Sequence, residues 1–335
     1  MTNPFTGTGF DMAAMTAAIN KLPNLYNRLV PIFRESGIAT TTLLVEQMNG
    51  TLSIVRSRPR GAPADKVEAD KRALRSFVIP HIPIDDILLP EDYQNVRAFG
   101  SEDALESQAS VLARKLEKMK NVLDQTREHL RMGALKGIIL DADGSTLYNL
   151  YTEFSISQKT VAFALDDDET DVRAKCSEVA DHIETNLKGE SMTGIHVFVD
   201  KTFFDALVKH PNVEKAYASY QVANQNLAGD YRRRFEFGGL IFEVYSAVWT
   251  DKDGTSRLAI ASGEGHAFPE GTGNTFEEVV APGNFIETVN TIGLPYYAKQ
   301  EPRRFNAGID LWAESNALPI CKRPEVLVKL TKAAA

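Results

Sequence analysis

The chain has 335 residues, of which 43% are hydrophobic and 24% charged, as expected for a globular protein of one large or two moderate domains. Its 45 acidic and 37 basic residues give a formal net charge of −8, which argues against general nucleic-acid binding but allows local basic patches. No signal peptide and no membrane span are predicted, since the chain has no run of about 18 apolar residues. The two cysteines, Cys176 and Cys321, lack metal-ligand spacing, so we expect reduced thiols and synthesis in a reducing cytoplasm.

Residues 1–40 form an apolar arm with little periodicity. The spacing of Met12, Met15, Ala18, Ile19 and Leu22 predicts a short amphipathic helix at 11–22. The segment that follows is too apolar for a free tail. We therefore expect the arm to bury its side chains on its own body or on a neighbouring subunit.

Residues 41–82 are predicted to form a long two-stranded excursion. A β-branched segment at 40–57 predicts the first strand, and Arg75–Ile84, whose prolines suit a sheet edge, predicts the returning strand. The segment from Arg56 to Arg75 contains seven basic and three acidic residues, which give it a net charge of +4. A loop exposed to solvent is sufficient to explain this charge. The more specific alternative is a basic extension that lies on an acidic surface of a partner. The candidate inter-subunit contacts are Arg56, Arg58, Arg60, Lys66, Lys71, Arg72 and Arg75.

Residues 101–136 are predicted to form the longest helix, about 50 Å at 1.5 Å per residue. Ser101 is placed to cap its start. Its apolar stripe comprises Leu105, Ala109, Leu112, Leu116, Met119, Leu123, Thr126 and Leu130. The charged residues assigned to the solvated face are Glu106, Arg114, Lys115, Glu117, Lys118, Lys120, Asp124, Arg127 and Glu128. By itself this pattern is typical of a long core or coiled-coil helix.

The segment after the helix predicts a hairpin, with strands at 138–140 and 146–151 and a turn at Asp143 and Gly144. A metal site at Asp141 and Asp143 is the weaker alternative, because a calcium loop needs further spaced oxygens and a closing Glu. The acids at 166–169 suit the start of a helix, since consecutive acids cannot all face one metal. That helix is predicted from the spacing of Val172, Cys176, Val179, Ile183 and Leu187.

The last third alternates between strands and helices, which indicates an α/β subdomain followed by strands. A buried strand is predicted at Gly194 and a short helix after it. A hairpin is predicted from Leu240–Val248, a turn at 251–254 and Leu258–Ala261. Ile309, Leu311 and Ala313 alternate with polar positions as in a strand, and another strand follows Pro324.

Motifs for catalysis are absent from the sequence. It contains no phosphate-binding glycine loop, no nucleophile elbow and no zinc-binding HExxH helix, and its six histidines are scattered. We therefore assign no catalytic, cofactor-binding or metal-binding residue and expect no enzyme. A metal-dependent hydrolase that uses Asp141, Asp143 or Asp166–Asp168 is kept as a remote alternative.

The ordered set of arm, basic excursion, long helix, hairpin and α/β region resembles the major capsid protein E family of tailed bacteriophages. That family includes the lambda head protein and has the Hong Kong 97-type capsid fold. An FRES segment before the basic stretch and a DxDGS hairpin after the long helix carry part of the likeness. The segments that carry it are Leu25–Gly61, Ile79–Asp103, Gly133–Tyr151 and Ala307–Leu330.

The resemblance implies an α+β fold of the Hong Kong 97 type. The implied division is an N-terminal arm at 1–40, an extended β-hairpin loop at 41–82, a peripheral domain at 83–165 and 276–335, and an α/β axial domain at 166–275. The helix at 101–136 would be the spine helix of the peripheral domain.

The implied function is that of a major capsid protein, which self-assembles as hexamers and pentamers into an icosahedral head around double-stranded DNA. Its implied partners are itself, a scaffolding protein, a portal and a decoration protein, with only non-specific contact to DNA and none to a membrane. Its implied location is the virion capsid after synthesis in the host cytoplasm. The alternative within the same fold is an encapsulin-like compartment that packages protein cargo.

Overall fold

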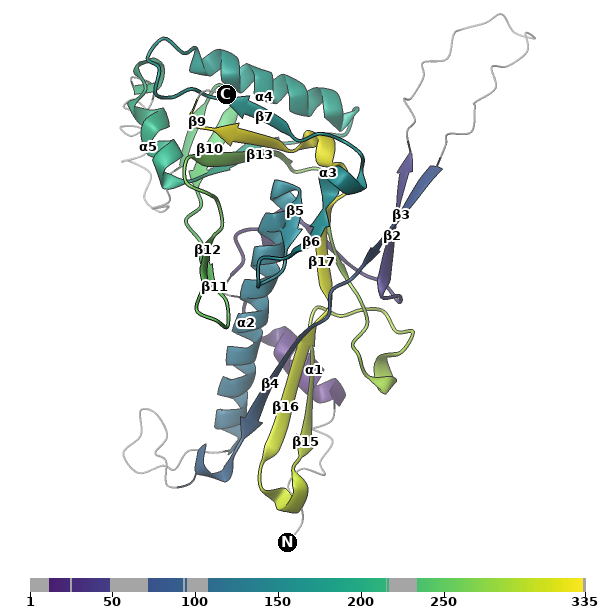
Figure 1. Cartoon of the computed structure of the whole chain (residues 1–335). Helices are drawn as coiled ribbons and strands as arrows, with labels where there is room; N and C mark the ends of the chain where they lie inside the picture. The colour runs from purple at the N-terminus through teal and green to yellow at the C-terminus, as the bar shows by residue number, and fades with distance from the viewer. Residues whose placement is uncertain are drawn as a thin grey trace, which may run out of the picture.

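The computed structural model describes residues 12–24, 26–48, 72–92, 94, 108–214, 216 and 234–333. The long helix α2, Gln108–Lys136, runs between a six-stranded sheet at one end and a three-stranded sheet beside its other half (Figure 1). In these described ranges no helix combines the length and the apolar character that crossing a membrane requires.

The buried side of α2 confirms most of the predicted apolar stripe. Leu112, Leu116, Met119, Leu123 and Leu130 are buried, whereas Ala109 is exposed and Thr126 half-buried. The predicted start at Ser101, with Leu105, falls outside the described residues. The 29 described helical residues span about 43 Å at 1.5 Å each.

The solvated face predicted for this helix is wrong over its second half. Lys120, Asp124, Arg127 and Glu128 are buried, with at most 3% of each exposed. The reason is that α2 is covered on more than one side there, so charged side chains face other charged groups of the chain. Lys120 Nζ donates to Asp124 Oδ2 at 2.7 Å, and Arg127 and Glu128 belong to the network described below.

One core lies between the first half of α2, the helix α1 and an antiparallel sheet of order β15-β16-β4. Met15 and Ile19 are buried in it, which confirms the predicted helix, but Ala18, which was assigned to the same face, is exposed. Ile309 and Leu311 are buried while Asp310 and Trp312 are exposed, as the alternation predicts. The elements are α1 Met12–Lys21, β4 Ile82–Leu88, β15 Tyr297–Pro302 and β16 Ile309–Ser315.

A larger core lies around a six-stranded sheet of order β7-β18-β13-β8-β10-β9, with the helices α4 and α5 packed beside it (Figure 1). Val172, Cys176, Val179, Ile183 and Leu187 are all buried, which confirms the predicted helix. Asp171 caps its start by accepting from Ala174 N at 3.0 Å. The elements are β7 Lys159–Ala162, α4 Val172–Leu187, β8 Gly194–Val199, α5 Lys201–Lys209, β9 Arg234–Phe237, β10 Leu240–Val244, β13 Glu264–Glu270 and β18 Val328–Thr331.

Two strands of this sheet come from outside the predicted axial range 166–275. β18 pairs antiparallel with β13 and parallel with β7, so the carboxyl-terminal segment and the 159–162 segment extend the sheet. Any axial unit based on 166–275 therefore shares its sheet with these two strands.

A second three-stranded sheet, of order β1-β14-β17, lies against the second half of α2. β14 is central, parallel to β1 and antiparallel to β17, and its residue Glu278 is buried. The ring of Phe33, just before β1, packs edge-on against the ring of Phe276, with 5.6 Å between the ring centres. The strands are β1 Arg34–Gly37, β14 Phe276–Val280 and β17 Ala317–Cys321.

The predicted hairpin after α2 is present, but its second strand ends early. The residues that follow Asn149 form a short helix, because the Asn149 side chain accepts from Tyr151 N at 3.1 Å and caps that helix. Gly137, with φ of 77°, lets the chain leave α2 and enter the hairpin. The elements are β5 Ile138–Leu140, β6 Thr146–Asn149 and α3 Leu150–Glu153.

Two predicted strands are each split in the structure. Leu240–Val248 is divided because β10 ends at Val244, opposite Val199, the last residue of its partner strand β8. The remainder belongs to a separate ribbon of β11 Val248–Thr250 and β12 Ser256–Leu258. Arg75–Ile84 is divided around Pro80, which cannot donate to a strand ladder. Its halves belong to β3, Arg72–Val78, and to β4.

Candidate functional site

In the sequence, the seven basic residues predicted as contacts follow β2, Thr42–Met48, and end within β3, and these two strands form a projecting hairpin (Figure 1). Arg56, Arg58, Arg60, Lys66 and Lys71 fall outside the described residues. Arg72 begins β3, and Arg75 is the one whose side chain the structure describes.

Arg75 makes contacts within its own chain at the base of the hairpin. Its Nη1 donates to the carbonyl oxygen of Glu153, and its guanidinium lies 4.9 Å from the centre of the Phe154 ring. On the same base, the buried ring of Phe77 meets the ring of Tyr148 edge-on at 5.2 Å. These contacts fix the direction in which the hairpin leaves the body.

Exposed apolar side chains gather on a loop between β14 and β15. Ile286 is 92% exposed and Ile292 70%, and Val289 and Leu294 are also exposed. The loop is nevertheless held firmly, because Asn284 N donates to Glu314 Oε1 at 2.6 Å and Leu294 N donates to the Tyr297 hydroxyl at 2.9 Å. An ordered loop that presents aliphatic groups to solvent is typical of a protein–protein contact.

A second exposed apolar group lies at the turn between β15 and β16. Phe305 is 99% exposed and has a φ of 63°, and Asn306 follows at 54°. A left-handed conformation is strained for a phenylalanine, and such strain is common at functional positions.

A buried ionic network joins α2 to β14. The Glu278 carboxylate accepts from Arg127 Nε at 2.9 Å and from Arg131 Nη2 at 2.7 Å. Arg131 Nη1 also donates to Glu128 at 3.2 Å. Burial alone would raise the pKa of Glu278, but the two guanidinium groups hold that pKa below its usual value. The network therefore favours the ionised form of Glu278 inside the protein, whereas burial raises the pKa of Glu128.

These residues were not predicted as a cluster, because charged positions on the long helix, such as Arg127 and Glu128, were expected to face solvent. One signal was present: Glu277 and Glu278 lie within the otherwise apolar run Phe276–Val280, and a carboxylate inside a buried strand requires a partner. Arg127 and Arg131 are spaced by four, so both can face the same carboxylate.

The candidate metal ligands are already engaged in turns. Asp143 Oδ1 accepts from Ser145 N at 2.7 Å, and Arg257 Nε donates to the Ala142 carbonyl oxygen at 3.1 Å. Arg257 Nη2 reaches Asp251 Oδ2 at 3.4 Å, so a guanidinium bridges this turn and the similar turn at 251–254. This supports the turn interpretation of Asp141 and Asp143.

The acids at 166–169 are arranged as a surface turn before α4. Asp166 pairs with Lys332 Nζ at 2.9 Å, and Asp167 Oδ1 accepts from Glu169 N at 3.1 Å. Across the described part of the chain, no three His, Cys, Asp or Glu side chains are placed to share a metal ion. Both cysteines are buried free thiols, and burial raises the pKa of Cys176 to about 12, so its thiolate is scarce.

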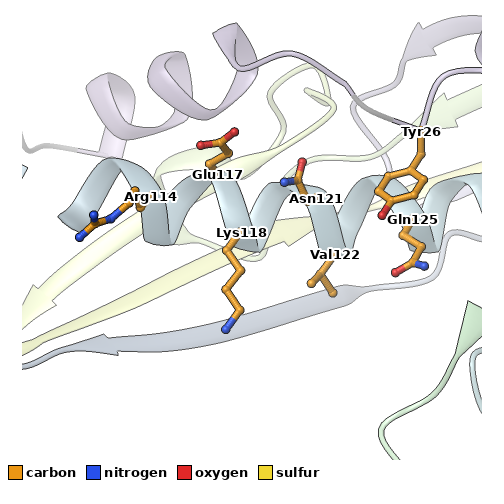
Figure 2. A pocket seen from close by; sticks show the side chains of 7 residues that line it. All are labelled: Tyr26, Arg114, Glu117, Lys118, Asn121, Val122 and Gln125. Atoms are coloured by element: carbon orange, nitrogen blue, oxygen red, sulfur yellow. The ribbon is translucent and has the colours of Figure 1, made fainter. Parts of the chain in front are cut away.

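An open groove of about 340 Å³ runs along the solvent side of α2, where Tyr26 lies over the helix (Figure 2). No histidine, cysteine, serine or threonine is among its lining residues, so they form no Ser–His or Cys–His pair. The residues that line it are Tyr26, Arg114, Glu117, Lys118, Asn121, Val122 and Gln125.

Comparison with known proteins agrees with the sequence interpretation. The family model described as phage major capsid protein E matches residues 11–332. The major capsid protein of Salmonella phage Felix O1 is 32% identical over 350 residues, which cover 95% of each chain.

Solved structures share the fold at much lower identity. The proposed capsid protein of an Escherichia coli CFT073 prophage has a TM-score of 0.61 at 16% identity and covers 96% of this chain and 99% of its own. The mature capsid of bacteriophage PhiM1 has a TM-score of 0.51 at 14% identity and covers 92% of this chain and 87% of its own. These likenesses confirm the predicted α+β capsid fold of the Hong Kong 97 type.

Proposed function

The chain belongs to the phage major capsid protein E family, and from this we propose that it self-assembles into the hexamers and pentamers of an icosahedral head around double-stranded DNA. The match of the family model to nearly the whole chain carries this proposal. The exposed aliphatic loop and the projecting hairpin support it, because both offer surface that a lone subunit leaves uncovered.

The domain roles follow from this proposal. Residues 1–40 would be the N-terminal arm and 41–82 the extended loop over a neighbour. Residues 83–165 and 276–335 would form the peripheral domain around α2, and 166–275 the axial domain at the capsomer centre. Contacts between unlike surfaces of successive subunits close into rings, as this arrangement requires.

The further partners would be a scaffolding protein, a portal and a decoration protein, and the chain would be made in the host cytoplasm. An overall charge of −8 suits an inner wall that encloses DNA but binds its phosphate backbone only weakly. We propose a structural role without catalysis. The hydrolase alternative is disfavoured by Arg257, which bridges the two aspartate turns.

Sedimentation and electron microscopy of the expressed protein test the assembly, with and without its scaffolding protein. Closed shells of uniform mass are expected. A compact monomer under all conditions would contradict the proposal. Shells that enclose protein cargo, with no portal and no DNA, would instead favour the encapsulin-like alternative. The relative from Felix O1 argues against that alternative, since it is itself named a major capsid protein.

Replacing Arg56, Arg58 and Arg60 together with glutamate is expected to block or greatly reduce shell formation. Each exposed ion pair contributes under about 1 kcal/mol, but the same contacts repeat in every capsomer. The measurement is the shell fraction in a sedimentation profile, with circular dichroism to verify that the subunit is folded.

The matched control replaces Arg232, Arg233 and Arg234 with glutamate. These three consecutive arginines carry the same charge as the first set and lie elsewhere in the chain. Normal shells from the 56/58/60 variant would remove these residues from the interface. Equal loss in both variants would mean that only the total charge matters.

A further inference from the structure

Two short ribbons of the fold each pack one face on the body of the protein and turn the other face to solvent. One is the ribbon of β11 and β12, and the other is the base of the hairpin of β2 and β3. Figure 1 shows them on opposite sides of α2. An isolated pair of strands is marginally stable in water, so each ribbon depends on the surfaces that it packs against.

The inner face of the ribbon β11–β12 is directed at the body of the protein. The Trp249 ring lies edge-on to the ring of His129 on α2, with 4.9 Å between the ring centres. Arg257, which is opposite Trp249, donates from Nε to the Ala142 carbonyl oxygen at 3.1 Å. Because side chains alternate along a strand, the residues on either side of Trp249 and Arg257 point away from the body.

The outer face of this ribbon is apolar and uncharged. Val248 and Leu258 are directly opposite each other, and they are 48% and 60% exposed. Thr250 and Ser256 form the other opposed pair on this face and are also exposed. The face therefore presents one aliphatic pair and one hydroxyl pair to solvent.

The base of the hairpin β2–β3 is built in the same way. Its inner face carries Phe77, whose side chain is fully buried. On its outer face Leu44 is 58% exposed and Val78 61%. The residues opposite these two are Ser76 and Thr42, so this face also presents two aliphatic and two hydroxyl side chains.

The two outer faces match in chemistry. Among their described side chains none is charged, so packing one face on the other buries apolar area and leaves no unpaired charge. The hydroxyl groups can also donate to one another across such a contact.

The position of the two faces determines which molecules can make this contact. They lie on opposite sides of one subunit, so they cannot meet within it. They can meet between successive copies of the chain. Such a contact joins unlike surfaces, which is the kind that closes into rings.

We propose that the outer face of the hairpin base of one subunit packs on the outer face of the ribbon β11–β12 of the next subunit. The inference rests on the proposed assembly and names one contact within it. Each face is small compared with the interface of a stable dimer. The contact therefore gains its effect by repetition around a ring of subunits.

Chemical cross-linking of assembled shells tests this contact. Leu44→Cys and Leu258→Cys are combined in one chain, and the purified shells are treated with a short bifunctional maleimide that is quenched before denaturation. The native Cys176 and Cys321 are fully buried and do not compete. The double variant is expected to give a ladder of cross-linked oligomers on a denaturing gel, because each copy offers one cysteine to each of two neighbours. Each single variant is expected to remain uncross-linked.

The matched control combines Leu44→Cys with Ser177→Cys, because Ser177 is exposed on α4 and lies outside both faces. An equally strong ladder from this control, or shells of the Leu44→Cys/Leu258→Cys variant without a ladder, would overturn the proposal. Dimers from either single variant would also overturn it, since they would show that like faces meet. Failure of the parent protein to form shells would instead contradict the proposed assembly, so the two failures are distinguishable.

A charge swap tests the same contact through assembly itself. Leu44→Lys and Leu258→Asp each place an unpaired charge in the contact, and each is expected to lower the shell fraction about tenfold. The combined variant pairs the two charges and is expected to recover most of that loss. Circular dichroism verifies that each variant is folded. Single variants that assemble like the parent, or losses that add in the combined variant, would overturn the contact.

Discussion

Replacing Glu278 with alanine is expected to lower the free energy of unfolding by about 3–5 kcal/mol. The substitution leaves Arg127 and Arg131, both 2% exposed or less, without the carboxylate that both guanidinium groups contact. Two buried cations would then lie on one helix face, with Glu35 and Glu128 as their remaining acidic partners. Chemical denaturation of the unassembled subunit, followed by circular dichroism, measures the loss.

The control is Asp310→Ala, which also removes the carboxylate partner of an arginine. In the parent, Asp310 Oδ1 lies 2.7 Å from Arg303 Nε. Its pair with Arg303 is largely exposed, so the expected loss is under about 1 kcal/mol. Glu278→Gln should fall between the two, since the amide oxygen still accepts hydrogen bonds but carries no charge. Equal, small losses in both alanine variants would show that the buried network contributes little.

The network also predicts a pH dependence. Because the pKa of Glu278 is lower in the folded than in the unfolded chain, its contribution is complete above the unfolded value of about 4.3. That contribution is lost as the pH falls through the lower folded value. Acid should therefore destabilise the parent protein more than Glu278→Gln.

Local patterns in the sequence were sufficient to predict a helix or strand and its buried side where only one face of the element packs against a core. The five residues from Val172 to Leu187 repeat at helical spacing and are all buried, and the alternation at Ile309–Ala313 matches β16. In both cases burial on one side decides the position of every apolar side chain. Periodicity therefore predicted the element and its orientation together.

Prediction failed where partners come from distant parts of the chain. Arg127 can be buried because it pairs with Glu278 on β14, which lies 151 residues further along the chain. A pattern of neighbouring residues cannot reveal a partner at that sequence distance. Arg28 is similar, since Glu243, which accepts its hydrogen bonds, lies 215 residues further along the chain. The Gly238–Gly239 turn was readable in principle, because paired glycines favour the tight hairpin that ends β9 and begins β10.

Replacing Gly293 with alanine is expected to lower the free energy of unfolding by about 3 kcal/mol and to displace the exposed apolar loop. A Cβ at this position would lie 2.2 Å from the Val280 carbonyl oxygen and 2.6 Å from the carbonyl carbon of Ala281. Both obstacles are backbone atoms of the segment that leaves β14, so no side-chain rotation can relieve the clash. The hydrogen bond from Gly293 N to the Ile38 carbonyl oxygen, 2.9 Å long, would be strained with it.

The matched control is Gly273→Ala, where the nearest atom to the added Cβ is a Glu190 carboxylate oxygen at 4.0 Å, an ordinary contact distance. That variant is expected to lose less than about 0.5 kcal/mol. Denaturant unfolding gives both values, and hydrogen exchange of the Leu294 amide reports whether its bond to Tyr297 survives. If Gly293→Ala kept both its stability and this protection, the backbone crossing at Ile38, Val280 and Gly293 would be looser than its contacts imply. The loop carrying Ile286 and Ile292 would then owe its position to Glu314 and Tyr297 rather than to the glycine.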